Sequence, residues 1–187
     1  RLSHIVIRII RPTMERYRQW DSPWMWERAA AGGGALTNLG GHGFDLAHHL
    51  LGDELRVESA VISNTLHNAE VEDYALVTLS GPRGVLVHIE VGYTMPTWPA
   101  NRSDNEFKIA GEKALLRAEP DGLRVLGPDR DEFIANDPSV ATGYPAYVAD
   151  CLARLARGDR PAVTPRDCAH AVALIHEAYS HGGPLSD

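Results

Sequence analysis

Four side chains that can form hydrogen bonds or exchange protons occur at helical spacing between positions 38 and 49. They are Asn38, His42, Asp45 and His49. At about 100° per residue these positions fall on one side of a helix, and the other side is apolar or small. The members of that other side are Leu36, Leu39, Gly43, Leu46, Ala47 and Leu50. The pattern predicts a helix with one packed face and one chemically active face.

His42 is the residue of this row best suited to catalysis, because an imidazole titrates near neutral pH and can act as a general acid or base. An amide cannot take up a proton, so Asn38 could only orient His42 or bind a substrate hydroxyl. An ordinary, partly buried histidine on a polar helix face is the plainer interpretation of His42. For Asp45 we expect pairing with an arginine or a loop contact rather than catalysis.

The same row could also belong to a metal-dependent hydrolase, because zinc takes histidine and carboxylate ligands. Groups at i and i+7 of a straight helix lie about 10 Å apart, which is too far for one ion. His42 and Asp45 would therefore need ligands from other segments, and we expect no metal.

Six glycines occur between Gly32 and Gly43, although each glycine inside a helix costs about 0.5–1 kcal/mol relative to alanine. Close approach of another backbone or of a flat ligand would explain them. Residues 32–34 would also leave N–H groups free at the positive end of the helix. A phosphate site is nevertheless poorly supported, because the G-x-G-x-x-G spacing fails and no Gly-Lys-Ser/Thr triplet follows.

Aromatic and cationic side chains outside the helix are further candidates for substrate binding. Trp24 and Tyr93, with Trp26 and Trp98, could line the mouth of a pocket, since aromatic faces suit sugars and other rings. Core or oligomer contacts are the alternative for these rings. Arg102 lies in a polar loop and could meet an anionic substrate, or it could simply be solvated.

The amino-acid composition indicates a globular protein and argues against two classes of binding partner. The chain has 187 residues, 44% of them hydrophobic and 23% charged, and a net charge of −7. These values indicate one globular domain that binds neither nucleic acid nor a membrane surface. No apolar stretch of the sequence is long enough to span a membrane. We expect Cys151 and Cys168 to be buried free thiols, as in a reducing compartment. Both expectations favour a cytoplasmic protein.

The hydrophobic periodicity predicts an α+β fold. A β-branched strand at 4–10 is followed by an irregular segment to about residue 31 and then by the helix. Alternating strands with turns between them follow at 57–64, 74–80, 85–93, 105–110, 114–118 and 123–126. Two helices close the chain, at 144–157 and from Pro165 to about His181. The result is an open, mainly antiparallel sheet with helices packed on one face.

The segment GGGALTNLGGHGFDLAHHLLG, residues 32–52, resembles the signature of the C-terminal domain of the glucose-fructose oxidoreductase / inositol dehydrogenase / MocA (Gfo/Idh/MocA) family. The usual form is G-G-G-x-L-x-D-x-G-x-H-x-x-D followed by an apolar run and a glycine. The early strand, the tryptophan-rich residues 21–26, the strand pair at 107–116 and the two final helices are also similar. The similarity covers nearly the whole chain.

The resemblance implies a two-domain oxidoreductase whose N-terminal Rossmann domain binds NAD or NADP. Residues 1–187 would form only the substrate-binding and oligomerisation domain, a fragment that is inactive alone. Neither a dinucleotide fingerprint nor the family's Glu-Lys-Pro motif is found in the sequence. His42 matches the family's acid/base histidine, and Asn38 takes the place where most members have an aspartate.

The implied reaction is oxidation of a hydroxyl of a polyol, sugar or similar small molecule. A homodimer or higher homo-oligomer through the open sheet face is also expected, because that face should expose a large apolar surface. The alternative is a ligand-binding or dimerisation domain that keeps the fold without catalysis, in which Asn38 marks the lost activity.

Overall fold

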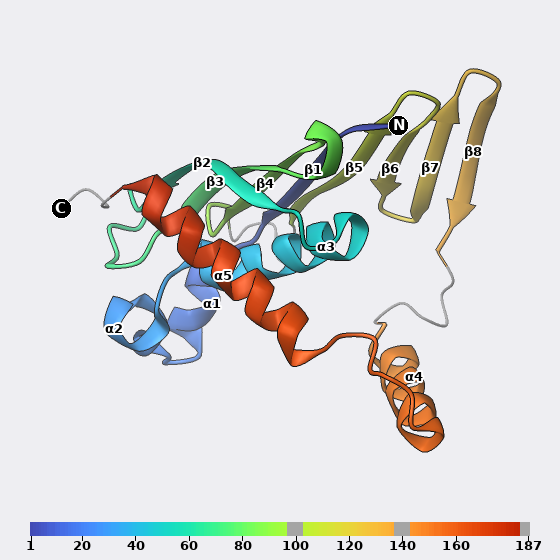
Figure 1. Cartoon of the computed structure of the whole chain (residues 1–187). Coiled ribbons are helices and arrows are strands. Elements are labelled where there is room, and N and C mark those ends of the chain that lie inside the picture. The colour runs from blue at the N-terminus through green and yellow to red at the C-terminus, as the bar shows by residue number, and fades with distance from the viewer. Residues whose placement is uncertain (97–102, 137–142, 184–187) are drawn as a thin grey trace.

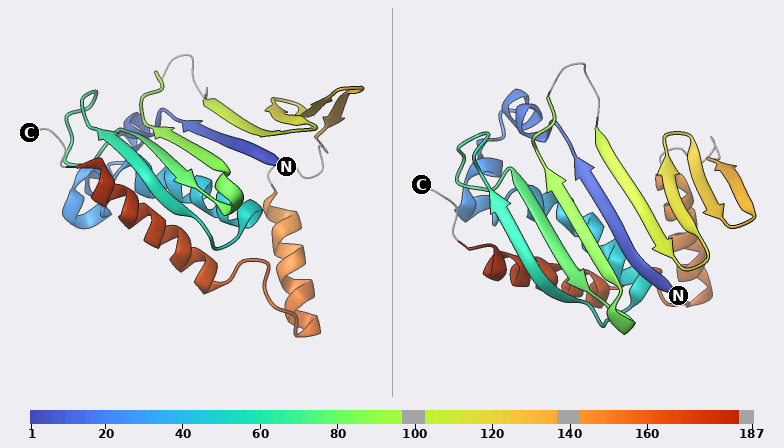
Figure 2. Two further views of the ribbon diagram at one scale, coloured as in Figure 1. Left: turned by 45° about the horizontal axis from the view of Figure 1, so that its top comes forward. Right: turned by 90° about the horizontal axis from the view of Figure 1, so that it is seen from above.

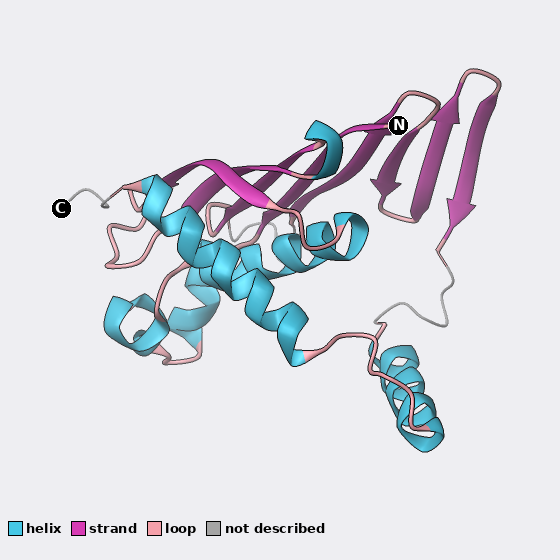
Figure 3. Ribbon diagram, in the orientation of Figure 1, coloured by secondary structure: helices cyan, strands magenta, loops and turns pink. Residues whose placement is uncertain are grey.

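Strand β1 (Leu2–Ile10) lies inside an eight-stranded sheet formed by the part of the chain that the structure describes. That part of the computed structural model comprises residues 1–96, 103–136 and 143–183. The strand order is β2-β3-β4-β1-β5-β6-β7-β8 (Figures 1 and 3). The other strands are β2 (Arg56–Ser63), β3 (Tyr74–Ser80), β4 (Leu86–Gly92), β5 (Asp104–Gly111), β6 (Leu115–Glu119), β7 (Gly122–Gly127) and β8 (Arg130–Ala135).

The sheet is mostly antiparallel, which confirms the expected fold class. β1 pairs antiparallel with β5 but parallel with β4, where Ile7 lies opposite Ile89. The first strand of the chain is thus inserted between two strands that come much later. Strand β8, whose residues are all exposed, was not predicted from the sequence.

Helices cover one face of the sheet around its first four strands (Figures 1 and 2). They are α1 (Thr13–Gln19), η1 (Pro23–Trp26), α2 (Arg28–Ala31), η2 (Leu36–Gly40), α3 (Gly41–Leu51) and α5 (Pro165–Gly182). A short turn, η3 (Pro82–Gly84), joins β3 to β4. The expectation that the segment before residue 31 is irregular was wrong, because α1, η1 and α2 occupy most of it.

The core lies between the sheet and these helices and follows the period of two in the strands. Ile5, Ile7 and Ile9 of β1 are buried on the helix side, as is Ile89 of β4. Phe44 of α3 is fully buried in the same cluster. We call Asn38, His42, Asp45 and His49 the active row, and the helix that carries them the active helix. This helix is therefore fixed to the centre of the sheet by apolar contacts.

Helix α4 (Tyr144–Arg157) departs from the expected arrangement, because it stands away from the sheet in Figure 1 and in the left view of Figure 2. None of its residues is buried, and Leu152 and Leu155 are 61% and 77% exposed. The expectation of two buried thiols was wrong as well, since Cys151 is half-buried on this helix and Cys168 of α5 is exposed.

The opposite, open face of the sheet carries charged side chains as well as apolar ones. Arg8 Nε donates to Glu90 Oε2 at 2.6 Å, and Arg8 Nη1 lies 3.3 Å from Glu106 Oε2. Leu76, which lies opposite Glu90, and Leu86, farther along β4, are 38% and 41% exposed on the same face. The face is thus mixed and not continuously apolar. The expectation of an oligomer depended on a large apolar surface there, so the structure weakens that reason. Among the described residues, no helix combines the length and the hydropathy that a membrane span requires.

Candidate functional site

The active row begins in a π-helical turn, η2, and continues into α3 without a break. The wider turn changes the helical period between Asn38 and the rest of the row, so the single straight line expected from a regular α-helix does not extend to Asn38. Within α3 the packed face was predicted in part: Gly43 and Ala47 are buried as expected, but Leu50 is 41% exposed, and Phe44, which was not included, is fully buried. A Cβ on Gly43 would lie 2.9 Å from Cγ2 of Ile89, so this glycine lets the helix lie directly on the sheet.

Glu72, in the segment before β3, holds the beginning of this helix. It is fully buried, and its Oε1 accepts hydrogen bonds from the backbone N–H groups of Gly34 and Leu36, both at 2.9 Å. Its Oε1 also accepts from the hydroxyl of Tyr179 on α5 at 2.7 Å. Burial and the Glu72 charge raise the pKa of Tyr179. A carboxylate at the positive end of a helix is favourable, so this contact stabilises the start of the active helix.

The glycines at 33 and 34 serve this contact. A Cβ on Gly34 would overlap the carbonyl oxygen of Glu72, and one on Gly33 would overlap the hydroxyl of Tyr179. Gly32 differs, because it has a φ of +77° and ends α2. The backbone N–H groups of residues 34 and 36 are bound within the protein, so they do not form a phosphate cradle. The close approach expected for the glycines is made by another part of the same chain.

Asn38 lies between two tyrosines, and this cluster was not foreseen. Its Nδ2 donates to the hydroxyl of Tyr17 on α1 at 2.7 Å and to that of Tyr93 at 3.0 Å. The two rings meet edge to face with centroids 6.1 Å apart. Asn38 is half-buried, whereas Tyr93 is only 1% exposed and Tyr17 7%. Tyr93 is thus part of the core, with its hydroxyl directed to the site, rather than part of an open pocket rim.

His42 has its side chain exposed on the first turn of α3. Asp45 is half-buried, and His49 is exposed on the last turn of α3. The structure thus leaves His42 open to a molecule that approaches the helix from outside. No group of three or more His, Cys, Asp or Glu side chains in the described residues is arranged to hold a metal ion.

A pocket of about 300 Å³ lies beside the Asn38 cluster and is lined by Tyr17, Arg18, Asp21, Ser22, Pro23 and Trp26. Arg18 lies over the ring of Trp26, with 4.6 Å from its guanidinium carbon to the ring centroid. Trp24, the tryptophan predicted to bind substrate, does not line this pocket and is 52% exposed. Arg102 and Trp98 lie outside the described residues.

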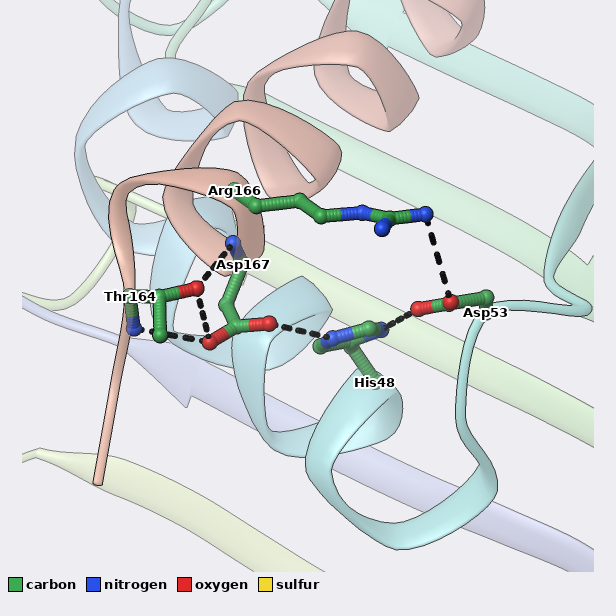
Figure 4. Close-up of polar contacts among 5 residues, drawn as sticks. All are labelled: His48, Asp53, Thr164, Arg166 and Asp167. Atoms are coloured by element: carbon green, nitrogen blue, oxygen red, sulfur yellow. Dashed lines mark hydrogen bonds and ion pairs between the residues drawn. The ribbon is translucent and has the colours of Figure 1, made fainter. Parts of the chain in front are cut away.

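A second polar cluster joins α3 to α5 (Figure 4). His48 Nε2 lies 3.3 Å from Oδ1 of Asp167, and its Nδ1 lies 3.6 Å from Oδ1 of Asp53. Asp167 also forms a capping box with Thr164, whose hydroxyl and N–H both donate to it at 2.7 Å. These bonds, with a smaller effect of His48, lower the pKa of Asp167 to about 2. The cluster fixes the start of α5 to the active helix.

The sequence of residues 2–117 matches the family model of the GFO/IDH/MocA C-terminal domain, which is more than half of the chain. The motif of residues 32–52 and the strands that support it lie within this match.

Solved structures share the fold at low sequence identity. One is an oxidoreductase from Agrobacterium radiobacter in complex with NAD+, L-tartaric acid and magnesium, with a TM-score of 0.80 and 17% identity over 97% of this chain and 55% of that chain. An aldose-aldose oxidoreductase from Caulobacter crescentus complexed with glycerol has a TM-score of 0.76 and 21% identity over 97% and 53%. The WlbA dehydrogenase from Bordetella pertussis, in complex with NADH and UDP-GlcNAcA, has a TM-score of 0.75 and 22% identity over 97% and 54%. The chain thus spans about half the length of these relatives.

Proposed function

The chain belongs to the GFO/IDH/MocA C-terminal domain family, and on that premise we propose that it is the substrate-binding and oligomerisation domain of an NAD- or NADP-dependent oxidoreductase. The substrate is a polyol, a sugar or a similar hydroxylated small molecule. The observation that carries the proposal is the exposed His42 on a helix that the sheet and Glu72 hold in place.

In the proposed reaction, His42 takes the proton of a substrate hydroxyl while the carbon that bears this hydroxyl is oxidised. A nicotinamide held by a separate domain would supply the hydride acceptor. Asn38 and its two tyrosines form the polar floor on which the substrate is oriented, because their hydroxyl and amide groups are fixed by one another. His42 is the proton acceptor in this scheme, since the Asn38 amide cannot be one.

The residues present here do not fit the phosphate groups of a dinucleotide. The N–H groups of Gly34 and Leu36, at the start of the active helix, are already bound by Glu72. We therefore place cofactor binding mainly on a separate dinucleotide-binding domain, and we expect residues 1–187 alone to catalyse no redox reaction.

The test measures reduction of NAD and of NADP by the full-length parent protein against a panel of polyols and sugars, with His42→Ala beside the wild type. Loss of an acid/base group is expected to lower turnover by about 100-fold or more. The matched control is His181→Ala, which removes another exposed histidine near the end of α5. Equal turnover of His42→Ala and the wild type would refute the assigned role.

A ligand-binding or dimerisation domain without catalysis is the second candidate. It is favoured by Asn38, which stands in the active row as a neutral amide with both its protons donated to tyrosines. Absence of turnover with every substrate, although the parent protein binds the cofactor, would favour this candidate.

Self-association through the open sheet face and a location in the cytoplasm complete the proposal. Leu76 and Leu86 on that face are candidate contacts, because the side chains of both are partly exposed. Sedimentation of the purified chain, compared with a Leu76→Lys variant, tests the interface. A wild type that sediments as a monomer at all concentrations would refute it.

A further inference from the structure

Helix α4 has an apolar face that the described part of the chain leaves open to solvent. The residues of this face recur at helical spacing, and they are Tyr144, Tyr147, Val148, Cys151, Leu152 and Leu155. All except Cys151 are exposed, with Tyr144 at 76% and Leu155 at 77%. A contiguous group of large apolar side chains on a surface marks a site of interaction. We call these residues the α4 face.

A helix of this kind needs a neighbour to be stable. α4 has 14 residues, and an isolated helix of that length is marginal in water. Helices in proteins gain most of their stability by packing an apolar face on another element. The ion pair between Arg154 and Asp150 within α4 is partly exposed, so it adds little. The α4 face therefore requires a partner.

The helix side of the sheet is also incompletely covered near α4. The helices that pack closely on the sheet do so on β1, β2 and β4, and α4 stands away from β6, β7 and β8 (Figure 1). Ile109 of β5 lies opposite Ile5, which is buried on the helix side. The apolar residues that share this side on β5 to β8 are Ile109, Leu116, Leu123, Val125 and Ile134. Of these only Val125 is buried, and Ile134 is 46% exposed, so the apolar surface of this side extends beyond α4.

We propose that the α4 face is the surface on which the dinucleotide-binding domain of the same polypeptide docks. The inference rests on the proposed function, which gives the parent protein such a domain. The chain spans about half the length of the relatives of known structure. A polypeptide of their size thus has a second part about as large as this one, which is large enough to cover α4.

The position of His42 favours this occupant. Gly43 packs against the sheet, whereas the neighbouring His42 is exposed on the helix layer. α4 lies on the same side of the sheet as α3 and α5 in Figure 1 and in the left view of Figure 2. A domain docked on the α4 face is therefore on the side from which a nicotinamide can reach His42. On the open face, the sheet itself would separate the two.

The size of the α4 face favours an attached domain over a second copy of the chain. A helix of 14 residues is about 20 Å long and 10 Å wide. One side of such a helix falls short of the roughly 800 Å² per partner that a stable complex of separate proteins buries. A domain on the same polypeptide is held at a high effective concentration, so a smaller interface is sufficient.

The first experiment identifies the neighbour of the α4 face in the full-length parent protein. Tyr147, which is 53% exposed, is replaced by the photoreactive residue p-benzoylphenylalanine, and the protein is irradiated. Mass spectrometry of the digested product locates the crosslink, and a mixture of isotopically labelled and unlabelled protein shows whether it joins one polypeptide or two. We expect a crosslink to the dinucleotide-binding domain of the same polypeptide.

The second experiment measures hydrogen exchange of the α4 amides in the same protein. Leu155→Lys should raise their exchange rates by about tenfold or more, because a buried leucine contributes at least that factor to a local opening equilibrium. Leu155 is exposed among the described residues, so this effect requires a contact from outside them. The matched control is Ala153→Lys, which places the same lysine on the opposite, exposed side of α4 and should exchange like the wild type.

Several results would overturn the inference. A crosslink within residues 1–187 or to a second polypeptide would assign the α4 face to a different occupant, and the absence of any crosslink would leave it without one. Equal exchange in Leu155→Lys and Ala153→Lys would show that the apolar face makes no contact. Protection of α4 that increases with protein concentration would indicate a second copy.

Neither measurement depends on turnover, so the inference and the catalytic proposal fail separately. A crosslink to the dinucleotide-binding domain in a protein that turns over no substrate would uphold the inference and count against catalysis. Turnover by a protein whose α4 face is unprotected would do the reverse.

Discussion

The substitution Tyr179→Phe tests whether the buried Glu72 carboxylate holds the active helix. The hydroxyl of Tyr179 donates to Oε1 of Glu72 at 2.7 Å and lies 2.9 Å from the hydroxyl of Thr37. Phenylalanine removes both contacts and keeps the ring. The two backbone donors, Gly34 and Leu36, stay in place, so the helix keeps its anchor but loses one of three hydrogen bonds to the charge.

The expected cost is about 2 kcal/mol of unfolding free energy, since a hydrogen bond to a charged group contributes about 1.5–3 kcal/mol. Tyr74→Phe provides the comparison within the same chain. The Tyr74 hydroxyl also donates to a carboxylate, Oε1 of Glu90, at a longer distance of 3.1 Å and on a half-exposed surface. We expect that variant to cost about 0.5–1 kcal/mol, because water screens and replaces the contact.

Equilibrium unfolding in urea at pH 7, followed by circular dichroism, measures both variants. The slope with urea should be unchanged, so that the midpoint alone reports the difference. A loss in Tyr179→Phe no larger than that in Tyr74→Phe would refute the assignment of Glu72 as a buried anchor.

Three further predictions concern stability. Gly34→Ala should lower the free energy of unfolding by about 3 kcal/mol, because the added Cβ overlaps the Glu72 carbonyl. Gly32→Ala should lower it by about 1 kcal/mol, because only the positive φ of this residue opposes the change. Similar urea midpoints for the two variants would contradict this prediction. Burial raises the pKa of Tyr93 above its value in the unfolded chain. The contribution of the protonated hydroxyl to folding stability is therefore present below about pH 10 and is lost as the pH rises through the folded pKa. Above about pH 10 the wild type should lose more stability than Tyr93→Phe, as urea unfolding would measure. The pKa of Asp167 is lowered from 3.8 to about 2. The contribution of its carboxylate to folding stability is therefore present above about pH 4 and is lost between about pH 4 and 2. Acid unfolding of Asp167→Asn should lack this loss of stability, and an acid profile identical to that of the wild type would count against the capping box.

The fold class was predictable because the strands alternate and the turns between them are rich in glycine and proline. Helix α1 was missed because it is short, follows Pro12 and buries only Thr13, Met14 and Tyr17. β8 was missed because it begins with three charged residues, at positions 130–132, and so does not alternate between apolar and polar residues. Propensity is local, and these two elements are held mainly by their neighbours in the fold.

The exposure of His42 on a helix face could be predicted from the spacing of the polar residues, and its catalytic role stays a prediction. The role of Glu72 could not, because its partners at 34, 36 and 179 come together only in the folded chain. The same holds for the pairing of Asn38 with Tyr17, which depends on the helix that was missed.

The π-helical turn η2 limits the chain lengths that this region tolerates. Its upstream end is bound to Glu72 through Leu36, and its downstream end leads into Gly43 and Phe44, which pack in the core beneath the sheet. Because a π-turn holds one residue more than an α-helical turn, removal of one residue between positions 36 and 40 would restore an ordinary α-helix with the two anchors still nearly in phase. Insertion of one further residue would instead rotate one anchor relative to the other by about 100°. Glu72 and the sheet could then not both be engaged, so this turn should tolerate the loss of one residue better than the gain of one.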